Sequence, residues 1–270
     1  MAVARRRLDA ELVRRKLARS REHASELIAA GRVSVGGTTA TKSATQVETS
    51  AAVVVAKDDN DPDYASRGGH KLAGALAAFV PQGLRIEGRY CLDAGASTGG
   101  FTDVLLRAGA GRVLAVDVGY GQLAWSLRTD ERVTVMDRTN VRELTPERIG
   151  GEQVDVVVGD LSFIPLGLVL PALASCCAAD ADLVLMVKPQ FEVGRERLGN
   201  GGVVRSPQLR AETVQRVAAQ GRHLGLGVLG VTASPLPGPS GNVEYFLWFR
   251  RGAPPLDPAD AVRAVDEGPR

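Results

Sequence analysis

The chain has 270 residues, of which 44% are hydrophobic, 24% charged and 4% aromatic, and its formal net charge is +2. This composition predicts a folded protein with room for one sizeable and one small domain, and it excludes a disordered tail protein. The near-neutral total hides an uneven distribution, because residues 1–35 carry nine basic against four acidic side chains, a local charge of +5, and the other 235 residues sum to −3. A basic N-terminal part of this kind suits contacts with phosphates.

The sequence predicts neither a membrane span nor a secretion signal. The most hydrophobic region, 154–187, is interrupted by acidic residues and prolines, and the basic residues after Met1 are not followed by an apolar segment. The three cysteines, Cys91, Cys176 and Cys177, have no metal-ligand spacing and no plausible disulfide framework. We therefore expect a cytoplasmic protein without a bound metal ion.

In chain order, the first pattern is a pair of short helices within residues 7–30. Apolar residues recur there at helical spacing, Ser20 is suited to cap the second helix, and Gly31 is suited to end it. Short strand patterns follow, and then a polar, acidic stretch with a proline that is typical of a domain boundary. We predict a small α+β domain over residues 1–62 and a linker over 63–67.

After the linker, strand patterns alternate with helix patterns, which predicts an α/β domain with a mostly parallel sheet covered on both faces. The last two strands are joined by the proline-rich loop 234–242 without a helix, so we expect them to pair as an antiparallel hairpin at one edge. This ending favours the seven-stranded, Rossmann-like sheet of a class I methyltransferase over a plain dinucleotide fold. The domain is predicted over 68–252, with a flexible tail over 253–270. The expected strands are 90–93, 112–116, 133–136, 154–159, 183–187, 227–233 and 244–249, and the expected helices are 69–79, 100–108, 122–127, 166–174 and 208–224.

A strand that leads into a Gly-rich turn and a helix, residues 92–101, is the strongest local signal. The turn lacks the G-x-G-x-x-G spacing of a pyrophosphate site, whereas Asp93, directly before it, suits a cofactor with a cationic amino-acid end. Asp117, after the next strand, is placed like the acid that holds ribose hydroxyls. We therefore expect S-adenosylmethionine rather than a dinucleotide, with a purely structural Gly-rich turn as the alternative. The candidate cofactor-binding residues are Asp93, Gly95, Ala96, Ser97, Thr98, Gly99, Gly100, Phe101, Asp117, Val118, Gln122, Thr139, Asn140 and Asp160.

Four charged residues form a second candidate site. Asp160 ends the fourth expected strand and Lys188 the fifth, so both emerge at the C-terminal edge of the parallel sheet, where ligands bind in open α/β folds. Either charge alone is equally typical of an ordinary strand end. Lys71, on the helix before the first strand, and Glu244, at the start of the last strand, complete a set of four candidate catalytic residues.

This set resembles, in order and placement, the Lys-Asp-Lys-Glu tetrad of RNA ribose 2′-O-methyltransferases. The flanking sequences are similar to those of the TlyA ("hemolysin A") family over residues 7–250, and residues 7–37 resemble the RNA-binding module of ribosomal protein S4. The supporting segments are SRGGHKL at 66–72, DAGASTGGF at 93–101, DVGYGQL at 117–123, KPQFE at 188–192 and PGPSGNVEY at 237–245.

The resemblance implies transfer of a methyl group from S-adenosylmethionine to ribose, typically of cytidines, in 16S and/or 23S ribosomal RNA. Such methylation can set sensitivity to ribosome-binding antibiotics. The implied partners are ribosomal RNA and ribosomal subunits, without stable membrane association, and a monomer is expected. In place of the usual family linker, Arg-Ala-Trp-Ser, this chain has Asp63-Tyr64-Ala65-Ser66. The candidate RNA-binding residues are Arg6, Arg7, Arg14, Arg15, Lys16, Arg19, Arg21 and Arg67.

Lys188 is the candidate group that removes or orients the proton of the ribose hydroxyl. Asp160 and Glu244 would stabilise the charged form of this lysine, whereas Lys71 would oppose it, and the sequence leaves the balance open. The basic, Gly-rich segment 194–202 could equally be a loop that covers RNA or a plain surface loop.

Three other functions remain as alternatives. A membrane-active haemolysin is disfavoured by the lack of a spanning segment. A non-catalytic RNA-binding assembly factor is disfavoured because all four charged positions are filled. Base methylation would need a different polar set after the fourth strand, often with an aromatic stacking residue.

Overall fold

The computed structural model describes residues 4–58, 62–199, 201–238 and 240–269. The chain forms two compact units, Met1–Asp63 and Tyr64–Arg270. Residues 64–67, expected to belong to the linker, are part of the second unit. The Tyr64 ring lies edge-on to His70, with centroids 5.1 Å apart, and beneath the Arg107 guanidinium. The backbone N–H of Ala65 donates to Asp103 over 2.8 Å, so this segment is fixed to the unit that follows it.

The first unit packs two helices against short strands. Its helices are α1 (Leu8–Arg14) and α2 (Arg21–Ala29), which together supply most of a small apolar core. Ser20 caps α2 by accepting the N–H of His23, and Gly31 follows with φ +70°, a backbone conformation that suits glycine. The strands, in two antiparallel sets, are β1 (Arg5–Arg7) with β4 (Gln46–Glu48), and β2 (Val33–Val35) with β3 (Thr38–Thr39) and β5 (Val53–Val55).

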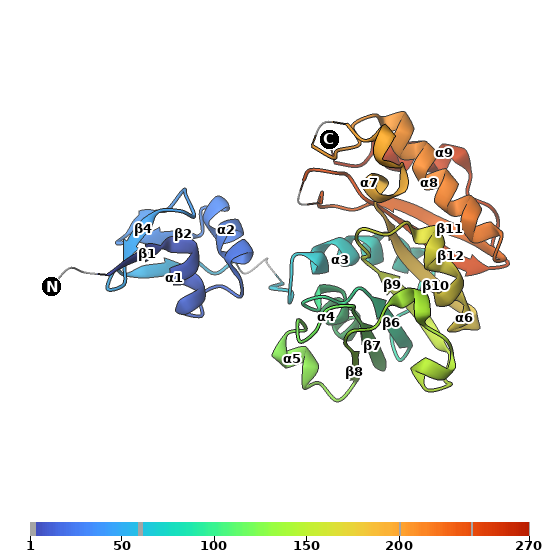
Figure 1. The fold of residues 1–270 in the computed structure, drawn as a ribbon, viewed down its shortest axis with the longest axis horizontal. Helices are drawn as coiled ribbons and strands as arrows, with labels where there is room; N and C mark the ends of the chain where they lie inside the picture. Colours follow the sequence, from blue (N-terminus) through green and yellow to red (C-terminus); the bar gives the residue numbers. More distant parts are fainter. Residues whose placement is uncertain (1–3, 59–61, 200, 239, 270) are drawn as a thin grey trace. The chain divides into compact units, whose positions relative to one another are not determined.

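The second unit is built on a seven-stranded sheet in the order β11-β12-β10-β9-β6-β7-β8. All neighbouring pairs are parallel except those of β12, which runs antiparallel to both β10 and β11. The expected mostly parallel sheet with an antiparallel ending is therefore confirmed (Figure 1). The strands are β6 (Tyr90–Ala94), β7 (Arg112–Val116), β8 (Val133–Met136), β9 (Val154–Gly159), β10 (Cys177–Val187), β11 (Leu226–Ala233) and β12 (Tyr245–Arg251).

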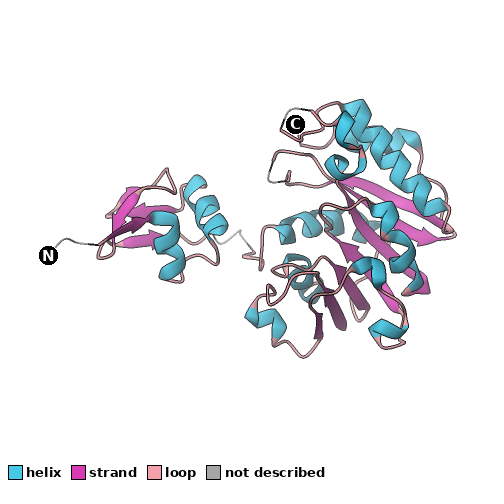
Figure 2. Ribbon diagram, in the orientation of Figure 1, coloured by secondary structure: helices cyan, strands magenta, loops and turns pink. Residues whose placement is uncertain are grey.

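Helices cover both faces of this sheet and create two apolar layers (Figure 2). Alternate residues of each strand enter opposite layers; in β6, Cys91 packs on one side and Leu92 on the other. One layer is closed by α3 (Gly68–Phe79), α4 (Gly100–Arg107) and the short α5 (Trp125–Arg128), and the other by α6 (Leu170–Ser175), α8 (Pro207–Arg222) and α9 (Pro258–Asp266). The remaining helical turns are η1 (Val80–Gln82), η2 (Val141–Glu143), η3 (Glu147–Ile149), η4 (Leu166–Leu168), α7 (Pro189–Glu192) and η5 (Arg195–Arg197).

The prediction of a flexible tail over 253–270 is wrong. Asp257 caps α9 by accepting the N–H of Ala259, and the helix buries Ala261, Ala264 and Val265 at spacings of three and four residues, against α8 and β11. Just before α9, the Pro254 carbonyl accepts the N–H of Val228 in β11. The segment therefore covers the edge of the sheet. The helix expected over 122–127 is also shorter than predicted, because only α5 forms there.

Among the helices of the described residues, none combines the length and apolar character needed to cross a membrane.

Candidate active site

The Gly-rich turn after β6 is held in a tight, partly left-handed conformation. Gly95 and Gly99 have φ values of +86° and +98°, and Ser97 has φ +47°. A Cβ atom at position 95 would lie 3.1 Å from the carbonyl oxygen of Asp160. Glycine therefore brings this turn directly against the residue that ends β9.

Asp93 at the end of β6 is completely buried and only half satisfied. Its Oδ2 accepts the hydroxyl of Thr102 over 2.7 Å, but its Oδ1 has no hydrogen-bond partner in the part of the chain that the structure describes. Burial raises the pKa of Asp93 to about 7, with the charge of Asp160 adding to the effect and the Thr102 hydroxyl opposing it. An unpaired carboxylate oxygen at this place is suited to receive a cationic group.

Asp117, directly after β7, arranges the loops around the turn. Its Oδ2 accepts the N–H of Ser97 and its Oδ1 the N–H of Gly119, both over 2.7 Å. Ser97 also donates its hydroxyl to Gln122 over 3.4 Å, and Thr139 donates its N–H to the Asp117 carbonyl. Four candidate cofactor residues are thus connected by hydrogen bonds.

Other candidate cofactor residues have structural roles. The Asn140 side chain accepts the N–H of Arg142 and caps η2. Phe101 is buried, with its ring 6.0 Å from that of Phe246, and Gly100 lets α4 approach α3, since a Cβ there would lie 2.8 Å from the Gly69 nitrogen. Of the other candidates in these loops, Ala96 is buried, whereas Thr98 and Val118 are exposed.

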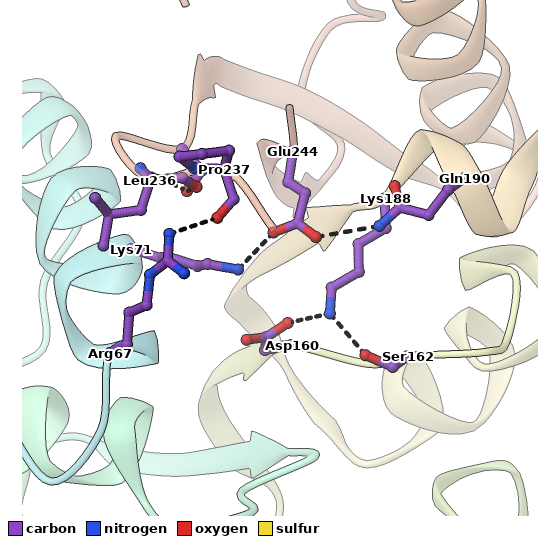
Figure 3. A network of polar contacts seen from close by, with 10 residues as sticks. Arg67, Lys71, Asp160, Ser162, Lys188, Gln190, Leu236, Pro237 and Glu244 are labelled. Atoms are coloured by element: carbon purple, nitrogen blue, oxygen red, sulfur yellow. Dashed lines mark hydrogen bonds and ion pairs between the residues drawn. The ribbon is translucent and has the colours of Figure 1, made fainter. Parts of the chain in front are cut away.

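The four charged candidates form two ion pairs (Figure 3). Lys188 Nζ lies 2.6 Å from Asp160 Oδ1, and Lys71 Nζ lies 2.5 Å from Glu244 Oε2. The Lys71 and Glu244 side chains are 8% and 1% exposed, and those of Lys188 and Asp160 are 9% and 21% exposed. Each pair is electrically neutral, which is how buried charges are tolerated.

The positions of these residues follow from the topology. Asp160 and Lys188 lie directly after the parallel neighbours β9 and β10, Lys71 lies on α3, and Glu244 precedes β12. Parallel strands bring their C-terminal ends to one edge of the sheet. Because Asp160 also adjoins Gly95, the Gly-rich turn and the ion pairs form one continuous site.

Two neutral residues of this network were not predicted from the sequence. Lys188 donates to the hydroxyl of Ser162 over 2.8 Å, and the side-chain amide of Gln190 donates to Glu244 Oε1 over 3.2 Å (Figure 3). Each lies two residues after a charged candidate, which was the available signal. Arg67, predicted to bind RNA, donates to the Pro237 carbonyl over 3.0 Å and connects the start of α3 to the loop before β12.

Most of the N-terminal arginines predicted to bind RNA form ion pairs within their own unit. Two buried carboxylates, Asp9 and Glu11, are the main partners, and the arginines lower the pKa of both, that of Glu11 to about 2. Arg15 also donates to two backbone carbonyls, so it has a structural role. Arg6 and Lys16 are exposed. The ion pairs are Arg7–Asp9, Arg21–Asp9, Arg14–Glu11, Arg15–Glu11 and Arg19–Asp63.

Both units match known protein families. Residues 6–53 match the S4 domain, and residues 64–251 match the FtsJ-like methyltransferases, a match that covers more than half of the chain. The chain belongs to the FtsJ-like methyltransferase family. The site at the C-terminal edge of the sheet is therefore the candidate active site of a methyltransferase.

Within this family, the chain is similar to TlyA proteins along its whole length. The 16S/23S rRNA (cytidine-2′-O)-methyltransferase TlyA of Mycobacterium tuberculosis (strain ATCC 25618 / H37Rv) is 59% identical over 98% of this chain and 99% of its own. Hemolysin A of Brachyspira hyodysenteriae is 35% identical over 90% of this chain and 99% of its own. A solved structure described as a hemolysin from Streptococcus thermophilus is 36% identical, with a TM-score of 0.78 and coverage of 98% and 96%. The predicted resemblance to the TlyA family is confirmed.

Proposed function

We propose that this chain transfers a methyl group from S-adenosylmethionine to the ribose 2′-hydroxyl of a cytidine in ribosomal RNA. The observation that carries the proposal is the pairing of Lys188 with Asp160 and of Lys71 with Glu244 beside the Gly-rich turn. The TlyA relative at 59% identity is named for this reaction on 16S and 23S rRNA. The S4 match and the basic first unit support an RNA substrate.

The residues at the Gly-rich turn fit S-adenosylmethionine. The unpaired Oδ1 of Asp93 would receive its ammonium group, and Asp117 would hold its ribose hydroxyls with the help of Gln122 and Thr139. When bound, the cofactor supplies an electrophilic methyl group on a sulfonium. The site then has to bring a ribose oxygen into line with that methyl group.

Lys188 is the proposed proton acceptor for the ribose 2′-hydroxyl. In the ion pair Lys188 is an ammonium ion, so it would first release a proton to solvent; the resulting amine at Nζ would then take the hydroxyl proton of the ribose and become an ammonium ion again. Asp160, 2.6 Å away, stabilises that positive charge. The positive charge would therefore lie on a group that is already next to a carboxylate.

Lys71 and Glu244 are the proposed holders of the target nucleotide. Their ion pair connects α3 to the start of β12, and Gln190 fixes the second Glu244 oxygen. An ammonium ion has three donors, so Lys71 can reach a ribose or phosphate oxygen while it remains bonded to Glu244.

In the first unit, Arg6 and Lys16 are the proposed phosphate contacts. We also propose that the protein acts in the cytoplasm, where ribosomal RNA would be its substrate, and that it acts as a monomer.

The proposal can be tested with isolated ribosomal subunits. The protein is incubated with methyl-labelled S-adenosylmethionine and either small or large subunits, and methylated riboses are mapped by mass spectrometry. We expect label on a cytidine 2′-oxygen with the wild-type protein. The Lys188→Ala variant should lose at least about 100-fold of this transfer because the proton acceptor is absent, while it still binds the cofactor in calorimetry. Lys57→Ala, which removes an exposed lysine outside the site, is the matched control.

Label on a base instead of a ribose would show that the assigned acceptor atom is wrong. Cofactor binding without transfer to either subunit or to free ribosomal RNA would instead indicate a non-catalytic RNA-binding protein.

A further inference from the structure

We infer that Ser162 is a positioning residue that directs the reactive nitrogen of Lys188 toward the ribose, an inference that rests on the methyl transfer proposed above. Two oxygens contact this nitrogen: Asp160 Oδ1 lies 2.6 Å away as an ion-pair partner, and Ser162 Oγ accepts a hydrogen bond over 2.8 Å. Both come from the loop after β9, whereas Lys188 comes from the end of β10 (Figure 3). The lysine is buried and Ser162 is exposed, so the serine lies on the solvent side of the pair.

Because the nitrogen of Lys188 is tetrahedral, a hydrogen bond to Ser162 orients the whole amine group. A neutral amine has one bond to carbon, two N–H donors and one lone pair. Ser162 Oγ accepts an N–H of Lys188, whereas Asp160 Oδ1 contacts the nitrogen as an ion-pair partner without a hydrogen bond. Because one N–H is directed at Ser162, the amine cannot rotate freely about its bond to carbon, and the direction of the lone pair is fixed. After proton transfer the hydrogen bond to Ser162 persists, and the new N–H occupies the position of the lone pair. Without Ser162, the ion-pair contact alone would leave the nitrogen free to rotate.

A hydroxyl suits this role better than a second carboxylate would. A second negative charge would further stabilise the ammonium form and so oppose proton acceptance by Lys188. The neutral Ser162 oxygen orients the amine without adding charge. Ser162 therefore fixes the geometry of Lys188 without changing the charge of its pair with Asp160.

The loop that carries Ser162 is itself held in place. The next residue, Phe163, has φ +65°, which is uncommon for a bulky side chain, and its ring lies 4.9 Å from that of Phe191 in α7. This contact joins the loop after β9 to the helical turn after Lys188. Ser162 and Lys188 are thus fixed relative to each other from both sides.

Single-turnover methyl transfer to ribosomal subunits, with the full-length protein, tests this inference. We expect Ser162→Ala to slow the methyl-transfer step roughly tenfold, since a small misplacement of a catalytic group has effects of this order or larger. Cofactor and RNA affinities should stay within about twofold of the wild type, because transition-state positioning alone is affected. Ser162→Thr, which keeps the hydroxyl, should recover most of the rate. Ser175→Ala, an exposed serine at the end of α6, is the matched control.

The outcomes distinguish a failure of the proposed methyl transfer from a failure of the positioning role of Ser162. If the wild-type protein transfers no methyl group to ribose, the proposed function fails, and the inference with it. If the wild type is active, a Ser162→Ala rate within about twofold of it would overturn the positioning role alone. So would a Ser162→Thr variant as slow as Ser162→Ala, or a defect confined to cofactor or RNA affinity.

Discussion

Asp93 combines complete burial with an oxygen that no donor reaches within the described residues. Burial raises its pKa from 3.8 to about 7. Between these two pH values the folded state therefore holds a proton that the unfolded state has released, so the stability of the ligand-free protein falls as the pH rises through this window and stays lower above it. The carboxylate thus reduces stability at neutral and alkaline pH, a cost that is typical of a binding group.

We expect Asp93→Asn to unfold at a higher temperature than the wild type at pH 8, by roughly 2–4 °C for each kcal/mol gained. The difference should disappear well below pH 3.8, where both states of the wild type bind the proton. In calorimetry, the wild type should bind S-adenosylmethionine more weakly as the pH falls below about 7, because the carboxylate becomes neutral, whereas the variant should bind weakly throughout. A variant with wild-type affinity and the same pH dependence would exclude Asp93 from the cofactor site.

At the scale of elements, Asp182 joins two antiparallel strands inside the sheet. From β10 it accepts the indole N–H of Trp248 over 2.6 Å and two guanidinium N–H groups of Arg250 over 2.8 and 2.9 Å, both from β12. It is 6% exposed, so these hydrogen bonds replace contacts with water. This one side chain helps to hold the strand that follows Glu244 against the strand that precedes Lys188.

Asp182→Asn should lower the thermal midpoint by roughly 2–12 °C, because it removes the carboxylate that pairs with Arg250 and accepts its hydrogen bonds, at a cost of about 1–3 kcal/mol. Asp180→Asn removes an exposed carboxylate that acts on Arg250 through its charge alone; it is the matched control and should change the midpoint much less. Calorimetric scans of both variants at one pH would make the comparison. Equal midpoints for the two variants would show that the network contributes nothing to stability.

The elements differ in how well the sequence predicts them. The strands β6, β7, β8 and β9 are short segments made mostly of apolar residues, a strong signal, and their predicted bounds agree with the structure to within a residue. The tail helix α9 was missed because its buried face consists mainly of alanines, which carry a weak hydrophobic signal. Ser162 and Gln190 could not be identified because hydrogen bonds between the ends of different strands depend on side-chain geometry, which spacing along the chain does not contain.

In the first unit, most of the arginines predicted to bind RNA pair with carboxylates of the same unit. Asp9 and Glu11 together engage four of them, so much of the local positive charge is compensated inside the first unit. The sequence shows both sets of charges but not which of them pair. Arg6 and Lys16 are exposed, and they are the better candidates for phosphate contacts.

A double variant, Arg6→Gln with Lys16→Gln, should weaken binding to ribosomal RNA and reduce its salt dependence. Each lost phosphate contact should lower the slope of log affinity against log salt concentration by about 0.7–0.9. Fluorescence anisotropy at several salt concentrations would measure this slope. Arg148→Gln, which removes a charge paired with Glu143 on the surface of the second unit, is the control. An unchanged slope in the double variant would rule out both residues as phosphate contacts.

The ion pair between Lys71 and Glu244 joins residues 173 positions apart. During synthesis the S4-like unit leaves the ribosome first, and Glu244 with β12 is made last among the parts of the site. A nascent chain can therefore fold its S4-like unit well before it holds a complete candidate active site. If the proposed function holds, an unfinished polypeptide cannot yet methylate the ribosome that is making it.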